Sequence, residues 1–391
     1  MNKITADVIV TNDGNPLLDH VVIYDDFGEI LNIDVRDKHQ DAKFIKGVLV
    51  PGYINAHCHL ELSHLKGVIP TGTGLVPFIR SVLGLRDFPQ NLIEEAIEKA
   101  DSDMWDAGIV AVGDISNKGD TVGVKLASNM KYHTFVEMFD LFQSQMTAQT
   151  IADNQGVYEA HSDADGHKKS YVPHAPYSVS DKIYDFIREA NAKGATVSIH
   201  NQELAAENEF FHYKSGEMVA FYDSIGLSLD AFKPTGTNSI LHTIRHMDPA
   251  QRSLFVHNTM TSEIDLRLAQ AWSPHTYWAT CPNANLYIEN RLPDYAMFLK
   301  GDAKMCIGTD SLTSNWQLSV FEEMKTIKKY QSVVPDMDII KWATINGAEA
   351  LGFDGLGKIT EGTTPGLNLI DVDVVDGVFN LSEARSSVKL V

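Results

Sequence analysis

The sequence predicts an α/β protein: a TIM-like (β/α)8 barrel with a small flanking β domain formed from both termini. Three observations predict this fold: eight short apolar runs rich in β-forming residues, helical patterns between many of them, and alternating strand patterns at the two ends of the chain. Strands that alternate with helices indicate parallel βαβ units. Eight such strands fit a closed barrel, and a doubly wound open sheet is the alternative.

The eight apolar runs define the expected barrel strands. In chain order they cover residues 47–57, 108–116, 132–140, 170–176, 195–201, 253–258, 276–283 and 304–310. Two clear helical patterns lie between them, at residues 91–108 and 180–194. Ser180 is the expected N-cap of the second helix, and Gly194 lies just past its expected end.

The two ends of the chain differ from its middle. Residues 1–50 alternate like antiparallel strands, and the tail 357–377 does the same. We therefore expect a small β-sandwich-like domain from residues 1–50 and 358–391, and a metal-dependent catalytic barrel from residues 51–357. The connection 204–252 is long for a barrel, and long loops at the carboxyl ends of barrel strands often shape the substrate pocket.

Composition narrows the classes of function. Hydrophobic residues make up 44% of the chain and charged residues 21%, which is ordinary for a globular protein. Acidic residues outnumber basic ones 52 to 32, which gives a formal net charge of −20. A protein that binds a nucleic-acid backbone needs an excess of Lys and Arg to replace counterions, so we expect no nucleic-acid partner.

The cysteines and the N-terminus predict a compartment. Cys58, Cys281 and Cys306 are scattered, and three cysteines are poor material for a disulfide framework. The N-terminus lacks a signal-peptide pattern, and no apolar run is long enough to cross a bilayer. We expect a cytoplasmic protein with a small-molecule substrate and no membrane partner. A homodimer remains open as its assembly.

The strongest chemical signal is the pair His57 and His59 at the end of the first expected barrel strand. Side chains two residues apart on a strand point to one face, so both imidazoles can bind one ion while Cys58 packs outward. Three further residues end apolar runs in the same way: His200, His257 and Asp310. Catalytic residues of TIM-like barrels lie at these strand ends. Imidazoles with a carboxylate suit Zn²⁺ or Fe²⁺ better than Mg²⁺ or Ca²⁺.

Six segments of the sequence resemble the amidohydrolase superfamily, in its deaminase and chlorohydrolase-like branch. They are PGYINAHCHLELSHLKG, PHAPYSVS, SIHNQE, VHN, CPNAN and GTDSLTSN. The branch includes cytosine, guanine, S-adenosylhomocysteine and aminodeoxyfutalosine deaminases, and the resemblance covers nearly the whole chain. The motifs are specific to the superfamily and much less specific to any substrate.

The resemblance implies a role for each matching position. The metal ligands it implies are His57, His59, His200 and Asp310. The catalytic residues it implies are Glu203 as proton shuttle, His257 as the group that orients water or substrate, and Asp310 as a contact of the attacking water. His174 matches a position that often contacts substrate. Cys58 departs from the commonest deaminase pattern, in which Thr is frequent, and its outward orientation makes this departure minor.

One metal ion is expected rather than two. Members of the superfamily with two ions usually bridge them by a carboxylated lysine on the fourth strand, whereas this strand carries His174 and is preceded by Lys168 and Lys169. Zn²⁺ is the preferred ion, with Fe²⁺ as the alternative. The HxE and PCxxC signature of the other zinc deaminase fold is absent.

Candidate substrate-binding residues follow from their places beside the metal motif. Glu61 and Ser63 come directly after His59, and Glu137 ends the third expected strand. For Glu61 a loop salt bridge is the alternative role. The long connection also carries the aromatic residues Phe210, Phe211 and His212. They either stack on a planar substrate ring or pack the connection onto the barrel.

These observations predict a hydrolytic deaminase that releases ammonia from an amino-substituted heterocycle. An adenine-containing nucleoside or a free base is expected, including an aminodeoxyfutalosine-like one. Three alternatives remain. A hydrolase on the same scaffold could cleave C–Cl or cyclic amide C–N bonds. A barrel of the same fold could bind a ligand without catalysis. The third alternative, a nucleic-acid editing enzyme, conflicts with the acidic charge.

Overall fold

The computed structural model describes residues 1–391, and its centre consists of two four-stranded parallel sheets. The first sheet has the order β5-β6-β7-β8 and the second β12-β11-β10-β9. The strands are β5 (Tyr53–Cys58), β6 (Ile109–Ser116), β7 (Lys131–Met138), β8 (Lys168–Pro173), β9 (Thr196–Asn201), β10 (Arg252–His257), β11 (Thr276–Thr280) and β12 (Met305–Ile307). Every residue of β5, β6 and β9 is buried, as expected for parallel strands covered on both faces.

The two parallel sheets contact each other along both edges. At one edge β8 lies beside β9, and the His200 N–H donates to the carbonyl of His174 at 3.0 Å. At the other edge β12 lies beside β5, and the N–H groups of Thr309 and Asp310 donate to the carbonyl of His57, each at 3.0 Å. Both junctions lie at the carboxyl ends of the strands, so they bring the polar residues that end the strands close together.

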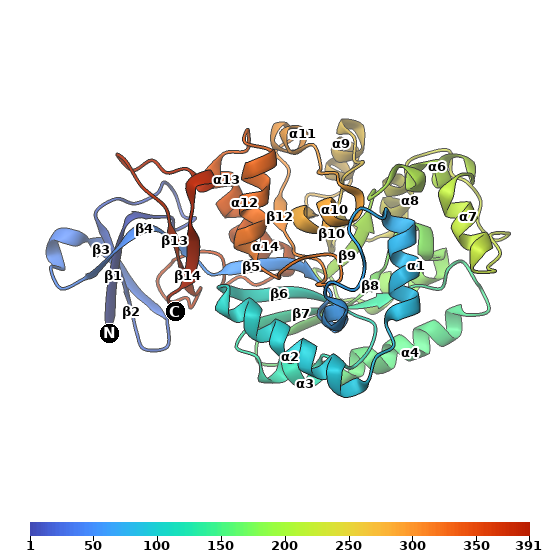
Figure 1. Cartoon of the computed structure of the whole chain (residues 1–391), viewed down its shortest axis with the longest axis horizontal. Helices are drawn as coiled ribbons and strands as arrows, with labels where there is room; N and C mark the ends of the chain where they lie inside the picture. The colour runs from blue at the N-terminus through green and yellow to red at the C-terminus, as the bar shows by residue number, and fades with distance from the viewer.

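Helices surround the parallel strands (Figure 1). They are α1 (Leu75–Leu85), α2 (Gln90–Asp106), α3 (Val122–Ala127), α4 (Thr147–Ala160), α5 (Asp181–Ala190), α6 (Ala205–Tyr213), α7 (Glu217–Ser224), α8 (Ser239–His246), α9 (Glu263–Trp272), α10 (Pro282–Glu289), α11 (Tyr295–Lys300), α12 (Val320–Tyr330), α13 (Asp336–Ala343) and α14 (Ile345–Leu351). None of them combines the length and apolar character that crossing a bilayer requires.

A six-stranded sheet contains strands from both ends of the chain, and both termini lie there in Figure 1. Its order is β14-β13-β4-β1-β2-β3. The strands are β1 (Asn2–Ile9), β2 (His20–Tyr24), β3 (Ile30–Val35), β4 (Lys43–Pro51), β13 (Leu367–Asp371) and β14 (Ser386–Lys389). The pairing of β1 with β4 is parallel and all other pairs are antiparallel.

The first expected barrel strand, residues 47–57, is divided between two sheets. Its beginning belongs to β4 of the terminal sheet, and β5 starts at Tyr53. The division falls at Gly52, whose N–H donates to the carbonyl of Pro365 at 3.1 Å. A Cβ at Gly52 would lie 2.7 Å from that same oxygen and 2.5 Å from a methyl group of Val110. The run is apolar on both sides of the break, and the dipeptide Pro51-Gly52, a common turn signal, is the feature of the sequence that marks it.

The helix expected at residues 180–194 is shorter in the structure than its sequence pattern indicates. Helix α5 ends at Ala190, because the side chain of Asn191 binds both the N–H and the carbonyl of Tyr171 in β8. Ser180 does occupy the N-cap position, but its hydroxyl donates to Asp140 and makes no cap bond within the helix. Tertiary partners therefore set both ends of this helix.

The long connection 204–252 is a helical segment that contains α6, α7 and α8. Its aromatic residues pack on one another, and the rings of Phe210 and Phe232 stack with centroids 4.1 Å apart. Phe210 and Phe211 are fully buried in this cluster, and His212 hydrogen-bonds Asn238 at 2.9 Å. These residues therefore pack the connection and do not line the active-site pocket described below.

Candidate active site

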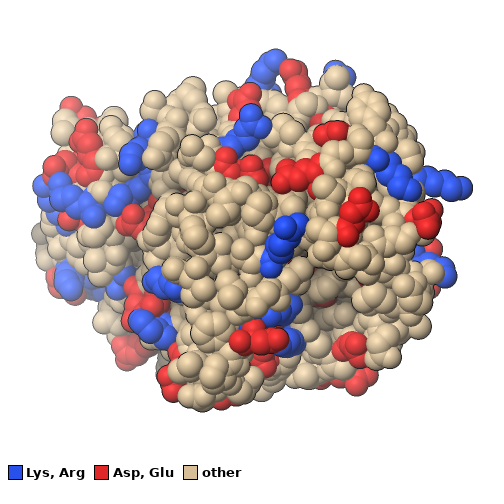
Figure 2. Space-filling view, turned by 45° about the vertical axis from the view of Figure 1, so that its right-hand side comes forward, with Lys and Arg blue, Asp and Glu red and all other residues tan.

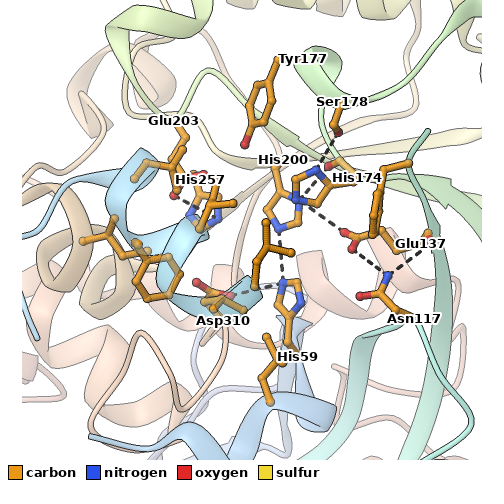
Figure 3. A pocket seen from close by; sticks show the side chains of 18 of the residues that line it. His59, Asn117, Glu137, His174, Tyr177, Ser178, His200, Glu203, His257 and Asp310 are labelled. Carbon is orange, nitrogen blue, oxygen red and sulfur yellow. Dashed lines mark hydrogen bonds and ion pairs between the residues drawn. The ribbon is translucent and has the colours of Figure 1, made fainter. Parts of the chain in front are cut away.

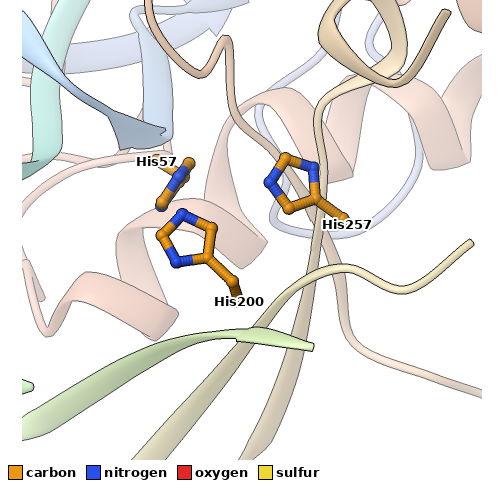
Figure 4. Close-up of side chains that lie close together, drawn as sticks. All are labelled: His57, His200 and His257. Carbon is orange, nitrogen blue, oxygen red and sulfur yellow. The ribbon is translucent and has the colours of Figure 1, made fainter. Parts of the chain in front are cut away.

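The carboxyl ends of the parallel strands bring four histidines and one aspartate together in a buried cluster (Figures 3 and 4). His59 lies at the centre, with its Nε2 atom 3.1 Å from Nε2 of His57 and 3.3 Å from Nε2 of His200. The same nitrogen lies 3.4 Å from Oδ1 of Asp310. One ring nitrogen each of His57, His200 and His257 also lies within 4.8 Å of the other two.

Neighbouring groups hold the outer polar atoms of this cluster. Nδ1 of His200 lies 2.7 Å from the carbonyl oxygen of His174, so Nδ1 carries the proton and Nε2 presents a lone pair to the cluster. In Asp310, Oδ2 accepts a hydrogen bond from Ser314 at 2.7 Å, which leaves Oδ1 facing the imidazoles. Partners of this kind fix the tautomer and orientation of metal-binding side chains.

The donor set fits a transition-metal ion. Ligands placed about 2.0–2.1 Å from a tetrahedral Zn²⁺ lie about 3.3 Å apart, which matches the 3.1–3.4 Å separations around His59. Burial lowers the pKa of both His59 and His200 to about 3, so both imidazoles are neutral. Neutral imidazoles with converging lone pairs are suited to bind a cation.

The backbone at two of these residues is strained. The φ angle is +74° at His257 and +58° at Asp310, in the left-handed region that residues other than glycine rarely adopt. Such conformations cost roughly 1–3 kcal/mol each and cluster at functional sites. The imidazole of His257 is held in place as well, because its Nδ1 lies 2.8 Å from Oδ1 of Asn285.

Glu203 lies beside His257 at the edge of the cluster (Figure 3). Its Oε1 is 3.8 Å from Nε2 of His257, and the residue is only 4% exposed. Burial is the main cause that raises the pKa of Glu203 to about 7, against a smaller lowering by His257. A carboxyl group with a pKa near neutrality can both accept and return a proton during a reaction.

The opposite wall of the pocket contains Glu137 and His174. Oε1 of Glu137 lies 3.6 Å from His200, and its Oε2 accepts a hydrogen bond from Asn117 at 3.1 Å. His174 lies 2.8 Å from the hydroxyl of Ser178 through its Nδ1. Both residues line the pocket, where sequence analysis places them as substrate contacts.

Glu61 lies outside the pocket lining. Its Oε2 accepts hydrogen bonds from the backbone N–H groups of Asn117 and Lys118, at 2.9 and 3.2 Å. Its Oε1 lies 3.7 Å from Arg86. Glu61 therefore supports the loop that carries Asn117. This arrangement corresponds to the loop salt bridge that the sequence left open as its alternative role. Cys58 is fully buried in the apolar core, consistent with its expected outward orientation.

The apolar wall of the pocket was not predicted from the sequence. Helix α1 supplies five of its residues, and the others are Leu62, Phe139, Leu141, Phe221 and Ile288. The residues of α1 in this wall are Leu75, Phe78, Ile79, Val82 and Leu83. Their spacing of three and four residues is an amphipathic pattern that could have revealed the helix. Four further polar residues of the pocket were also missed: Asn117, Tyr177, Ser178 and Arg86, of which Arg86 is the only Lys or Arg in the lining.

Comparison with known proteins places this geometry in a family. The profile of the amidohydrolase family matches residues 48–391. The chain is 27% identical over 347 residues to an aminodeoxyfutalosine deaminase of Nitratiruptor sp., a match that covers 86% of this chain and 81% of that protein.

Solved structures share the fold. Aminofutalosine deaminase of Helicobacter pylori, in complex with methylthio-coformycin, has a TM-score of 0.83 at 21% identity and covers 100% of both chains. Atrazine chlorohydrolase TrzN of Arthrobacter aurescens, complexed with zinc, has a TM-score of 0.75 at 14% identity and covers 98% of this chain and 92% of its own. Because the family profile matches most of the length of this chain, the chain belongs to the amidohydrolase family.

Proposed function

We propose that the chain is a metal-dependent deaminase that hydrolyses the exocyclic amine of an adenine-containing nucleoside or a related heterocycle and releases ammonia. The observation that carries this proposal is the pair Glu203 and His257 beside a cluster of metal-ligating groups, with the pKa of Glu203 raised to about 7. The deaminase names of the relatives support it.

The proposal includes a scaffold of two parts. The two parallel sheets, which contact each other along both edges, form a (β/α)8 barrel from residues 51–357. Residues 1–50 and 358–391 form the flanking β domain, and their shared six-stranded sheet supports this division. Strands β4 and β5 are separated by Gly52 alone, so the two parts are joined without a linker.

His57, His59, His200 and Asp310 would hold one divalent ion, with Zn²⁺ preferred. When bound, such an ion supplies Lewis-acid activation of a water molecule. Lys168 and Lys169 belong to β8 but lie at its amino end, away from the site, and Nζ of Lys169 is bound to the carbonyls of Tyr158 and His161. These lysines therefore leave no bridging group for a second ion, in keeping with a one-metal site.

Proton transfers are assigned to the residues around the cluster. Glu203 takes a proton from the attacking water and delivers it to a ring nitrogen, while the water oxygen bonds to the carbon that bears the amine. His257 holds the developing charge on that oxygen, with its ring fixed by Asn285. Asp310 helps to pass a second proton to the amine, which then leaves as ammonia.

Cleavage of a C–Cl bond is the second candidate, because the chlorohydrolase TrzN shares the fold. The two reactions differ in what the leaving group needs. An amine leaves only after it gains a proton, whereas chloride leaves as the anion. The proximity of Glu203 to His257 and Asp310 provides groups that can move protons, and this favours deamination.

A substrate screen tests the proposal. Adenine, adenosine, 5′-deoxyadenosine, guanine, cytosine and a chlorinated triazine are offered to the purified protein, and ammonia and chloride are measured together with metal content. We expect ammonia from a purine compound and no chloride. Chloride release in the absence of ammonia release would contradict deamination.

The variant Glu203→Gln tests the proton-shuttle role. We expect it to keep its metal content and to lose roughly 10²–10⁴-fold in turnover, the usual contribution of general acid–base groups. The matched control is Glu209→Gln, an exposed glutamate on α6, which should retain normal turnover. Near-normal activity of Glu203→Gln would reject the assignment.

A further inference from the structure

A second cluster of metal-ligating side chains lies on two outer helices. His242 and His246 are four residues apart on α8 and therefore share one face of that helix. Asp181 is the first residue of α5, which packs against α8. Oδ1 of Asp181 lies 3.6 Å from Nε2 of His246 and 3.9 Å from Nε2 of His242. None of the three residues lines the active-site pocket.

His242 carries a free nitrogen inside this cluster. The residue is 8% exposed, and its Nε2 atom is buried without a hydrogen-bond partner. Burial, and secondarily the neighbouring His246, lowers the pKa of His242 to about 4, so the imidazole is neutral at physiological pH. A buried polar atom without a partner destabilises the folded state, and a bound ion would remove that penalty.

The three ligand atoms lie within 4.8 Å of one another and must draw closer together to coordinate an ion. Ligand atoms of a tetrahedral Zn²⁺ lie about 3.3 Å apart, slightly closer than the observed 3.6 and 3.9 Å. The side chain of Asp181 is 69% exposed, so it is free to rotate towards the two imidazoles. The coordination sphere would be completed by solvent, since the cluster opens into a surface cavity.

The charges around the cavity select the class of ion. Lys182, Lys233 and Arg245 line the same cavity, and Asp181 is the only acidic residue there. Hard cations such as Ca²⁺ and Mg²⁺ need several oxygen ligands and gain no attraction from this setting. Imidazole binds borderline transition metals through its lone pair. We propose that His242, His246 and Asp181 form a transition-metal site, occupied by Zn²⁺, that ties α5 to α8.

An ion at this site would brace one wall of the active-site pocket. Helix α8 packs against the short 3-10 helix Pro176–Ser178, and Tyr177 and Ser178 of that helix line the pocket. Helices α5 and α8 also contact each other directly, because the ring centroids of Tyr184 and His246 lie 5.5 Å apart and Arg188 donates to the carbonyl of His246 at 3.2 Å. Because the ion would bind only the folded arrangement of the two helices, it would raise the stability of the native state.

Metal stoichiometry tests the proposal. Wild-type protein and the variant His246→Gln are dialysed against a buffer of micromolar free Zn²⁺, and bound zinc is counted by atomic emission. We expect one equivalent more in the wild type, and a larger rise of Tm on addition of Zn²⁺. Any ion in the active-site pocket is present in both proteins, so the difference is independent of the proposed function.

Two further variants complete the test. His275→Gln removes an exposed histidine outside the cluster and should keep the wild-type stoichiometry. Asp181→Asn alters the exposed ligand, so it should fold normally and lose the additional equivalent. The proposal is overturned if His246→Gln and Asp181→Asn bind as much Zn²⁺ as the wild type, or if His275→Gln loses the same amount.

Discussion

At the scale of single residues, burial determines which protonation states the site uses. It keeps the imidazoles of His59 and His200 neutral, with a pKa of about 3, and it raises the pKa of Glu203 to about 7. The same buried environment therefore prepares the histidines to bind a cation and the glutamate to exchange a proton. Sequence motifs located these residues, but the shifts depend on the packing around them.

The pH dependence of catalysis follows from Glu203. Its carboxylate, the form that accepts a proton, predominates above its pKa, so kcat/KM should fall as the pH decreases through that value. A bound cation favours the carboxylate and shifts the decline downward, at or below about pH 7. A kcat/KM profile over pH, measured with the metal-loaded enzyme, checks this expectation. A profile that stays flat on the acid side of neutrality would contradict it.

Lys125 holds a buried carboxylate next to the histidine cluster. Its Nζ lies 2.7 Å from Oδ2 of Asp114, and Oδ1 of Asp114 accepts the N–H of Leu60, the residue after His59. In Lys125→Met the carboxylate stays buried without its counter-charge, so we expect a loss of about 3–5 kcal/mol in the free energy of unfolding and a lower metal content. Urea denaturation and metal analysis measure both effects.

The control for Lys125→Met is Lys99→Met, which breaks an exposed pair with Asp103. Exposed pairs of this type contribute roughly 0–1 kcal/mol, so its unfolding midpoint should stay close to that of the wild type. Equal midpoints for Lys125→Met and the wild type would show that the buried pair does not support the fold.

At the scale of elements, the strands were easier to predict than the segments that cover the site. The strand ends at His200, His257 and Asp310 follow apolar runs, and the structure places all three in one cluster. The connection 204–252 was predicted only as a pocket-shaping loop, and its contribution to the lining is the single residue Phe221. The largest apolar contribution from one element comes from α1, whose amphipathic pattern was not recognised in the sequence.

Helix α1 should govern substrate affinity rather than the chemical step. Leu83 lines the pocket and is 48% exposed, so Leu83→Ser removes apolar contact at little cost to stability. We expect KM to rise while kcat changes little, because the contact is the same in the ground state and the transition state. Leu85→Ser is the matched control, since Leu85 is 41% exposed on the same helix outside the pocket lining. Equal changes of KM in the two variants would show that this wall does not contact the substrate.

At the scale of the whole molecule, the six-stranded sheet and the parallel strands share one continuous stretch of chain. Sequence patterns predicted both parts, with the terminal sheet drawn from the two ends as observed. The expected domain boundary lies between residues 50 and 51, yet the expected strand 47–57 runs across Gly52, because Val48, Leu49 and Val50 on one side and Tyr53 and Ile54 on the other are equally apolar and buried. The dipeptide Pro51-Gly52 is the local signal of the break, and the contacts of Gly52 with Pro365 fix the division in the structure.

The expectation of no nucleic-acid partner rests on the distribution of charge. Figure 2 shows acidic and basic side chains interspersed over the displayed face, without a continuous basic patch. With a net charge of −20, such a surface gives little attraction for a polyanion.

The boundary at Gly52 gives a test of how the two sheets are joined. In Gly52→Ala the new Cβ would lie 2.5 Å from Val110 and 2.7 Å from the carbonyl oxygen of Pro365, so the strands must separate. We expect a loss of about 1–3 kcal/mol in the free energy of unfolding, as for other overpacked sites. Thermal unfolding measures the change. Gly84→Ala on α1 meets open space and should be neutral or slightly stabilising, and an equally neutral Gly52→Ala would refute the close approach.

Strand β4 depends on partners from both ends of the polypeptide, and this has a consequence for biosynthesis. While the ribosome is still adding residues, β1 can pair with one edge of β4, but the edge that β13 later covers stays open until the last part of the message has been translated. Nascent chains would therefore present a bare, apolar strand edge, a recognised starting point for aggregation. A premature stop codon just ahead of β13 should leave all of the proposed catalytic residues encoded and yet yield insoluble protein.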